Sequence, residues 1–362
     1  MKVVAVDQKL ICVIVAWIAQ DGDTLVCKVP CRVDCLRRRD EIGSIRQLPR
    51  YGHTATLLRD GKFYIGGGGI SPPSDNYETD LVDRDELFDP ATETFQPTGK
   101  LHRAWHTATR LQNGDVLFTG GMSADNTTQL ILSAGDELLK AGSGTLQPTG
   151  NMSIARYSHT ATLLQDGKLL ITGGYDSSPK ILPTAEIYDP VSGTFTRVGD
   201  MGKPRSGHFA TLLTTGKVLI TGGGIAGSGV ADAELFDPAT SAFTSAGKTS
   251  SSTVGAATLL SDGRVLISGE ANSDFSGPAP GEIYDPANGK FTPTGTMATL
   301  RFGYSATLLP DGTVLIAGGE MVDGSRRPVV ADSEIYNPAT GAFTLGPMMS
   351  QSMACGSEAT RV

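Results

Sequence analysis

One sequence unit recurs six times at nearly constant spacing, and this repeat limits the possible folds more than any other feature. Each copy has a stretch similar to His-Thr-Ala-Thr-Leu-Leu, followed by an apolar run that ends in glycine. Successive run-ending glycines are 53, 53, 49, 47 and 49 residues apart: Gly67, Gly120, Gly173, Gly222, Gly269 and Gly318. A fixed period of about 50 residues indicates stacked supersecondary units.

Each unit is expected to contain four short strands. The first is the His-Thr-Ala-Thr-Leu-Leu stretch and the second is the apolar run. Between them stands an Asp-Gly or Asn-Gly pair such as Asp166-Gly167. This pair is typical of a hairpin turn in which both residues take positive φ. The third strand is Ala-Glu-Ile-Tyr-Asp-Pro (185–190) and its relatives. The fourth opens with a large apolar residue: Phe95, Leu146, Phe195, Phe243, Phe291 or Phe343.

Four antiparallel strands do not bury both of their faces alone. Six such sheets that cover one another do, which predicts an all-β fold of the β-propeller type. A long amphipathic helix would need apolar residues at 3.6-residue spacing, and no segment of the repeats has this pattern. The glycine pair that ends most second strands fits a bend where two backbones approach closely.

The repeats resemble a known family. The Gly-Gly pair, a downstream Tyr or Phe and the aromatic residue that opens the fourth strand look like kelch repeats. The stretch His-Thr-Ala-Thr-Leu-Leu-x-Asp-Gly is similar to bacterial kelch proteins related to the central domain of galactose oxidase. The resemblance covers about residues 50–350 and implies a kelch-type propeller of four-stranded antiparallel blades. Unit 5 departs from it, because Gly269-Glu270 replaces the glycine pair.

The two ends of the chain leave the number of blades open between seven and six. We expect residues 50–362 to form the propeller, with residues 1–49 as an N-terminal segment. Residues 355–362 match the start of a seventh unit, and strand-like stretches at 10–17, 24–29 and 42–48 are candidates to complete it. Such a blade, closed by both termini, would hide two sheet edges. Alternatively, the propeller has six blades and a separate N-terminal segment.

Charge and hydropathy exclude several classes of partner. The net charge is −8, and residues 51–362 carry −11 of charge because the first 50 residues carry +3. An acidic body repels phosphate backbones, so nucleic acid is not an expected partner. The longest apolar run, residues 10–19, is half as long as a membrane-spanning helix needs to be, so no membrane span is expected. The resemblance implies a secreted or extracellular protein, although residues 1–19 make a poor signal peptide because of Asp7 and Trp17.

Two sets of charged side chains recur with the repeat and predict scaffold contacts. Arginine recurs before the first strand: Arg50, Arg103, Arg156, Arg205 and Arg301. Glutamate recurs in the third strand: Glu86, Glu137, Glu186, Glu234, Glu282 and Glu334. Guanidinium and carboxylate groups make bidentate, charge-assisted pairs, so we predict structural Arg–Glu pairs in the blades. In unit 5 Ser252 replaces the arginine, which leaves Glu282 without this partner.

A third repeated position is expected at the mouth of the central channel. It holds His53, His106, His159 and His208, and in unit 6 Tyr304. Clustered histidines there could bind a metal or exchange protons. Because the histidine recurs in four blades, a structural role is favoured, and catalysis usually needs one asymmetric constellation.

The segments between the second and third strands vary most, and loops on a rigid scaffold commonly carry function. The candidate ligand-binding residues in these segments are Asp75, Tyr77, Asp80, Asp83, Glu270, Arg326 and Arg327. We therefore predict a non-catalytic kelch propeller that acts as a binding or protein-interaction module through these loops. Its expected partner is a protein or a carbohydrate, and no catalytic residue, metal site or cofactor is assigned.

The alternative is an enzyme, galactose-oxidase-like or carbohydrate-active, with its site at the channel mouth. The resemblance implies, for the oxidase version, a copper held by two histidines and two tyrosines, one of them cross-linked to a cysteine. Cys355, Tyr304 and the repeated histidines are the residues that could approach such a centre. The sequence has no Tyr-His dipeptide to supply paired ligands, so the binding module is the favoured hypothesis.

Overall fold

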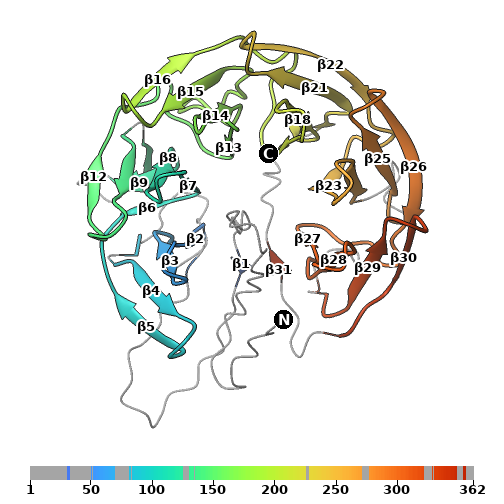
Figure 1. Cartoon of the computed structure of the whole chain (residues 1–362), viewed down its shortest axis with the longest axis horizontal. Helices are drawn as coiled ribbons and strands as arrows, with labels where there is room; N and C mark the ends of the chain where they lie inside the picture. The colour runs from blue at the N-terminus through green and yellow to red at the C-terminus, as the bar shows by residue number, and fades with distance from the viewer. Residues whose placement is uncertain are drawn as a thin grey trace. The chain divides into compact units, whose positions relative to one another are not determined.

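Antiparallel pairing of strands in groups of four organises this chain. The computed structural model describes residues 31–32, 50, 52–69, 81–82, 84–124, 130–133, 135–225, 228–270, 277–321, 328, 330–348 and 354–355. Within these ranges there are strands, bridges, turns and bends, and no helix. Six sheets have four strands each, in sequential order (Figure 1). These sheets, called blades 1 to 6 below, confirm the all-β expectation.

The chain divides into two compact units, and Met1–Thr149 contains the first two blades. Blade 1 consists of β2 (Thr54–Leu57), β3 (Phe63–Gly66), β4 (Glu86–Asp89) and β5 (Thr94–Pro97). Blade 2 consists of β7 (Thr107–Arg110), β8 (Val116–Thr119), β11 (Glu137–Leu139) and β12 (Leu146–Pro148). β6 (Arg103–Ala104), β9 (Met122–Ala124) and β10 (Leu130–Leu132) form a separate three-stranded sheet. The short strand β1 (Cys31–Arg32) precedes the first blade in the sequence.

Gly150–Val362 contains the other four blades. Blade 3 consists of β13 (Thr160–Leu163), β14 (Leu169–Thr172), β15 (Ala185–Asp189) and β16 (Thr194–Arg197). Blade 4 consists of β17 (Phe209–Leu212), β18 (Val218–Thr221), β21 (Asp232–Asp237) and β22 (Ala242–Lys248), with β19 (Gly224–Ile225) and β20 (Ser228–Gly229) as a small hairpin. Blade 5 consists of β23 (Val254–Leu259), β24 (Val265–Gly269), β25 (Pro280–Asp285) and β26 (Lys290–Thr296). Blade 6 consists of β27 (Ser305–Leu308), β28 (Val314–Ala317), β29 (Ser333–Asn337) and β30 (Ala342–Leu345), followed by β31 (Ala354–Cys355).

The described residues thus form six complete blades, the smaller of the two numbers that the sequence allows. The segments expected to build a seventh blade, residues 1–49 and 355–362, lie almost entirely outside the described ranges. The turn prediction needs a correction. Gly167 has φ +84°, but Asp166 does not take positive φ. The Asp166 carboxylate instead accepts the N–H of Lys168, so the aspartate caps the turn and the glycine alone supplies the left-handed residue.

Within each of the two units, the hydrophobic core lies between successive blades. In the second unit, Leu266 and Ile283 of blade 5 pack in one cluster with Val314 and Ile316 of blade 6. Within blades, an aromatic pair joins the third and fourth strands, as Tyr188 and Phe195 do with ring centroids 4.7 Å apart. The same pairing occurs in four more blades, while blade 2 has Leu139 opposite Leu146. The large apolar residue near the start of each fourth strand is therefore half-buried and packs against its partner on the third strand.

Candidate functional site

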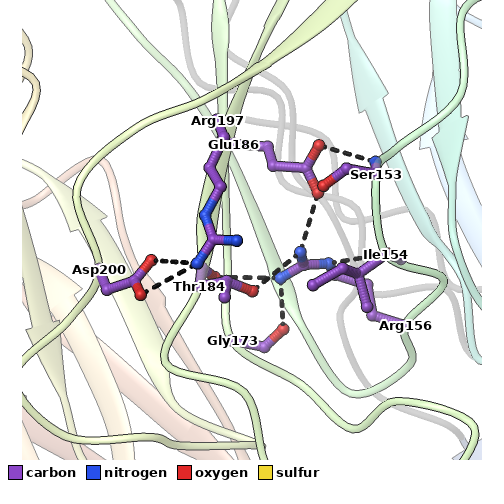
Figure 2. Close-up of polar contacts among 8 residues, drawn as sticks. All are labelled: Ser153, Ile154, Arg156, Gly173, Thr184, Glu186, Arg197 and Asp200. Atoms are coloured by element: carbon purple, nitrogen blue, oxygen red, sulfur yellow. Dashed lines mark hydrogen bonds and ion pairs between the residues drawn. The ribbon is translucent and has the colours of Figure 1, made fainter.

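The repeated arginines and glutamates form the predicted scaffold pairs. In blade 3 the Arg156 guanidinium lies 2.9 Å from Glu186 and also donates to the carbonyls of Gly173 and Thr184 (Figure 2). Arg156 is fully buried, and the second oxygen of Glu186 accepts the N–H of Ser153. Equivalent ion pairs of 2.7 to 3.1 Å join Arg50 to Glu86, Arg103 to Glu137, Arg205 to Glu234 and Arg301 to Glu334. Each arginine thus joins the segment before the first strand to the end of the second strand and to the third strand.

Two of the repeated histidines join neighbouring blades. Nε2 of His208, in blade 4, lies 3.0 Å from the Thr160 hydroxyl and 2.8 Å from the Thr172 hydroxyl, both in blade 3. Nε2 of His106, in blade 2, lies 2.8 Å from the hydroxyl of Thr54 in blade 1. These contacts give the imidazole a structural role, because each satisfies a buried hydroxyl of the preceding blade.

His53 and His159 hold the same repeat position in blades 1 and 3. Burial, together with the charge of Arg50, lowers the pKa of His53 to about 4, so this imidazole is neutral near pH 7. His159 is buried and lies against Gly174: a β-carbon added to Gly174 would come within 3.0 Å of the His159 Cβ. Both residues therefore belong to the packed ends of the first strands.

Blade 5 lacks both the repeated arginine and the repeated histidine. The difference lies at the end of the blade where β23 begins, β24 ends and β25 begins. We call Ser252, Glu270, Glu282 and the neighbouring Tyr304 the blade 5 site. Tyr304, from blade 6, replaces the histidine, and its hydroxyl lies 2.8 Å from Ser268 Oγ and 3.2 Å from the carbonyl oxygen of Gly269. A β-carbon at Gly255 would collide with the Tyr304 ring, so Gly255 makes room for this longer side chain.

Glu270 is the one candidate loop residue from the sequence that lies in the described ranges, and it belongs to the blade 5 site. Its N–H donates to the carbonyl of Thr253, the same bond that Gly224 makes to Ser206 and Glu320 to Phe302. Gly224 and Glu320 each come directly after a complete glycine pair. Glu270 is therefore equivalent to the residue after the pair, and blade 5 has one glycine, Gly269, where the other blades have two. Asp75, Tyr77, Asp80, Asp83, Arg326 and Arg327 lie outside the described residues.

The Glu270 carboxylate is held in a poorly solvated place. Its Oε1 lies 3.4 Å from the main-chain nitrogen of Gly303 in blade 6. Burial raises the pKa of Glu270 to about 7, although the Gly303 N–H acts in the opposite direction. Burial also raises the pKa of Tyr304, and the charge of Glu270 adds to this effect. Glu270 can therefore exchange a proton near neutral pH, or accept a hydrogen bond from a ligand.

Glu282 is the second carboxylate of the blade 5 site, and it has no arginine. It is only 6% exposed, and its Oε2 accepts the N–H of Ser250 at 2.8 Å, as Glu186 accepts that of Ser153. Ser252 takes the place of the arginine, and no lysine or arginine of the described residues forms an ion pair with Glu282. Sequence comparison identified this substitution, whereas the contact between Gly255 and Tyr304 depends on how two blades pack and was missed.

A copper site of the kind that the resemblance implied does not fit the residues present. Nε2 of His106 and of His208 lies within hydrogen-bonding distance of threonine hydroxyls, and the Tyr304 hydroxyl contacts Ser268. Among the residues that the structure describes, no three His, Cys, Asp or Glu side chains come together in a way that could hold a metal ion. We therefore derive no reaction through copper. The described part of the chain also contains no helix long and apolar enough to cross a membrane.

Comparisons with known proteins agree with the blade architecture. Residues 156–202, which span most of blade 3, match the kelch motif. Two solved structures are similar in fold. One is a fungal alcohol oxidase of the AA5 family, described as a complex with copper, at 18% identity and a TM-score of 0.62 over 83% of this chain. The other is YjhT, at 13% identity and a TM-score of 0.56 over 79% of this chain and 94% of its own length.

These likenesses extend to the fold alone, because both identities are low. The chain spans 66% of the length of the oxidase, slightly less than two thirds. A search of curated proteins finds no match. The repeated Arg–Glu pairs, the blade topology and the motif match agree with one another. The chain therefore has a fold of the β-propeller type, and its blade 3 carries a match to the kelch motif.

Proposed function

We propose that this protein is a binding module whose ligand surface lies at the blade ends where the second strands connect to the third. One observation carries the proposal. The polar side chains that recur at these ends, Arg156 and His208 among them, make scaffold contacts. Blade 5 replaces them, and its two carboxylates, Glu270 and Glu282, form no ion pair with a cation of the described residues. A departure from a repeat in a single blade supports one specific site.

The chemistry of this end favours a ligand that offers hydrogen-bond donors. Glu270 and Glu282 are acceptors, and the chain is acidic overall, with a net charge of −8. Protein side chains and carbohydrate hydroxyls both present such donors. The candidate loop residues Asp75, Tyr77, Asp80, Asp83, Arg326 and Arg327 belong to connections of the same kind in blades 1 and 6, so we keep them as candidate binding residues of those connections.

The test compares variants at the two ends of the blades. Wild-type protein is screened against glycan and peptide arrays, and hits are measured by calorimetry. We expect Glu270→Gln, and a variant with Asp75 and Asp80 both replaced by Ala, to weaken the hits. The control is Asp166→Asn, because Asp166 is an exposed turn residue at the opposite end of blade 3. Hits that survive both loop variants and are lost in Asp166→Asn would overturn the proposal.

A catalytic role is the second candidate, and the Glu270 pKa of about 7 is what favours it. A carboxyl group that titrates near the working pH is suited to general acid–base catalysis. Under this hypothesis, turnover of a carbohydrate substrate would change with an apparent pKa near 7 and be lost in Glu270→Gln. Turnover that persists in Glu270→Gln would exclude it.

A further inference from the structure

The strongest unexplained feature is the buried carboxylate of Glu282, whose equivalent in every other blade forms an ion pair with an arginine. In blades 3, 4 and 6 the arginine guanidinium sits among three acceptors. These are the glutamate, the carbonyl that ends the second strand, and the carbonyl two residues before the glutamate. Figure 2 shows this arrangement around Arg156. The group that these acceptors recognise is therefore a planar cation with several N–H donors.

Blade 5 has kept the carboxylate and lost the cation. Glu282 pairs with Ile267 in the same register as Glu186 with Ile171, and its Oε2 makes the same contact to a serine N–H. Its Oε1 corresponds to the Glu186 oxygen that accepts Arg156. A buried carboxylate without a cation is unfavourable, because loss of hydration is not offset by an ion pair.

The surrounding residues have changed in a concerted way. Ser252 stands at the arginine position, because Thr253 accepts the bond that Ser206 accepts in blade 4. The carbonyl of Gly269 is contacted by the Tyr304 hydroxyl. The carbonyl two residues before Glu282 belongs to Pro280, in the place of Thr184 of blade 3.

We propose that the blade 5 site binds a guanidinium group, with Glu282 as its counter-ion and the Pro280 carbonyl as a second acceptor. The group comes from a small guanidino compound or from an arginine side chain of a protein partner. This inference rests on the proposed binding function and deepens it by naming the chemistry that the site recognises. A guanidinium fits better than an ammonium group, because the acceptors retained from the repeat match a planar fork of donors.

The test uses probes that differ in charge and little in shape. Ethylguanidine is titrated into the full chain by calorimetry, with ethylurea as the neutral planar control. An arginine-containing peptide and its citrulline counterpart distinguish a protein source from a small molecule. We expect the cationic member of each pair to bind at least about tenfold more tightly than the neutral one.

Three variants place the binding at Glu282. Glu282→Gln keeps an acceptor for the Ser250 N–H, so it should fold, and we expect it to weaken ethylguanidine binding about tenfold or more. Ser252→Arg supplies the guanidinium from the chain itself and should abolish binding. Ser192→Arg adds the same side chain at an exposed turn of blade 3 and should leave binding unchanged.

Equal binding of ethylguanidine and ethylurea would overturn the inference, and so would unchanged ethylguanidine binding in Glu282→Gln. If ligands found for the loop surface still lose affinity in Glu270→Gln, the proposed function stands while the guanidinium inference fails. If neither Glu270→Gln nor Glu282→Gln changes the binding of any ligand, both fail.

Discussion

The same substitution in two blades should change stability in opposite directions. Glu186→Gln in blade 3 removes the charge that faces Arg156, a side chain with no exposed surface. It leaves a guanidinium buried beside a neutral amide, and removing one partner of a buried ion pair costs about 3–5 kcal/mol. Glu282→Gln in blade 5 removes a buried charge that pairs with no arginine in the part of the chain that the structure describes. We expect it to leave the free energy of unfolding unchanged or to raise it by about 1 kcal/mol.

The two variants are compared by urea denaturation and by thermal unfolding at neutral pH. Both residues lie in the unit Gly150–Val362, so the comparison is made within one unit. For a unit of about 200 residues, 1 kcal/mol corresponds to roughly 2–4 °C in Tm, so Glu186→Gln should lower Tm by about 6 °C or more. Glu282→Gln should match or exceed the wild-type Tm. Equal destabilisation by the two substitutions would refute the reasoning, because it would show that an arginine partner is irrelevant to the burial of this glutamate.

Three further predictions address the other contacts. Gly174→Ala should lower the free energy of unfolding by about 2–3 kcal/mol, because φ is +90° and a β-carbon would approach the Tyr157 carbonyl oxygen to 2.5 Å. The control Gly289→Ala, at φ +68° with open space around it, should cost about 1 kcal/mol. Equal losses of stability in urea denaturation would contradict this. His208→Leu removes the imidazole partner of the Thr160 and Thr172 hydroxyls, which keep only their bond to each other, and should cost about 1–3 kcal/mol. A loss below about 0.5 kcal/mol would argue against the bridge. Glu270 titrates near pH 4.5 when unfolded and near 7 when folded, so the folded state binds the extra proton and stability falls as pH rises between these values. Glu270→Gln should flatten this part of the pH–stability curve, and an unchanged curve would disprove the assignment.

The repeat made the blades and the arginine pairs predictable from the sequence. Six copies of one unit constrain one another, so the strand order and the partner of Arg156 followed from comparing units. The absence of an arginine beside Glu282 followed in the same way, from a substitution at an aligned position. These are contacts within one blade, where the spacing along the chain determines which residues meet.

Contacts between blades were beyond such reasoning. The bonds from His208 to Thr160 and Thr172 depend on the packing of two sheets, and no sequence spacing encodes this packing. The sequence comparison placed Glu270 at the second position of the glycine pair. Its bond to Thr253 shows that the second glycine is missing and that Glu270 is equivalent to the residue after the pair. Of the loop residues chosen from the sequence, Glu270 alone lies in the described ranges, and the others stay predictions.

The position of each buried arginine also affects how freely the neighbouring loop can change. Arg156 bonds the carbonyls of Gly173 and Thr184, which stand at the two ends of the connection between β14 and β15. The ends of this connection are thus held at a fixed separation by a residue outside it. Doubling the length of a flexible loop between fixed ends costs only about 0.6 kcal/mol in closure entropy. Peptides grafted between residues 174 and 183 should therefore be tolerated. Blades 1, 4 and 6 offer the same kind of insertion point, because Arg50, Arg205 and Arg301 also bond the carbonyls at both ends of the connection.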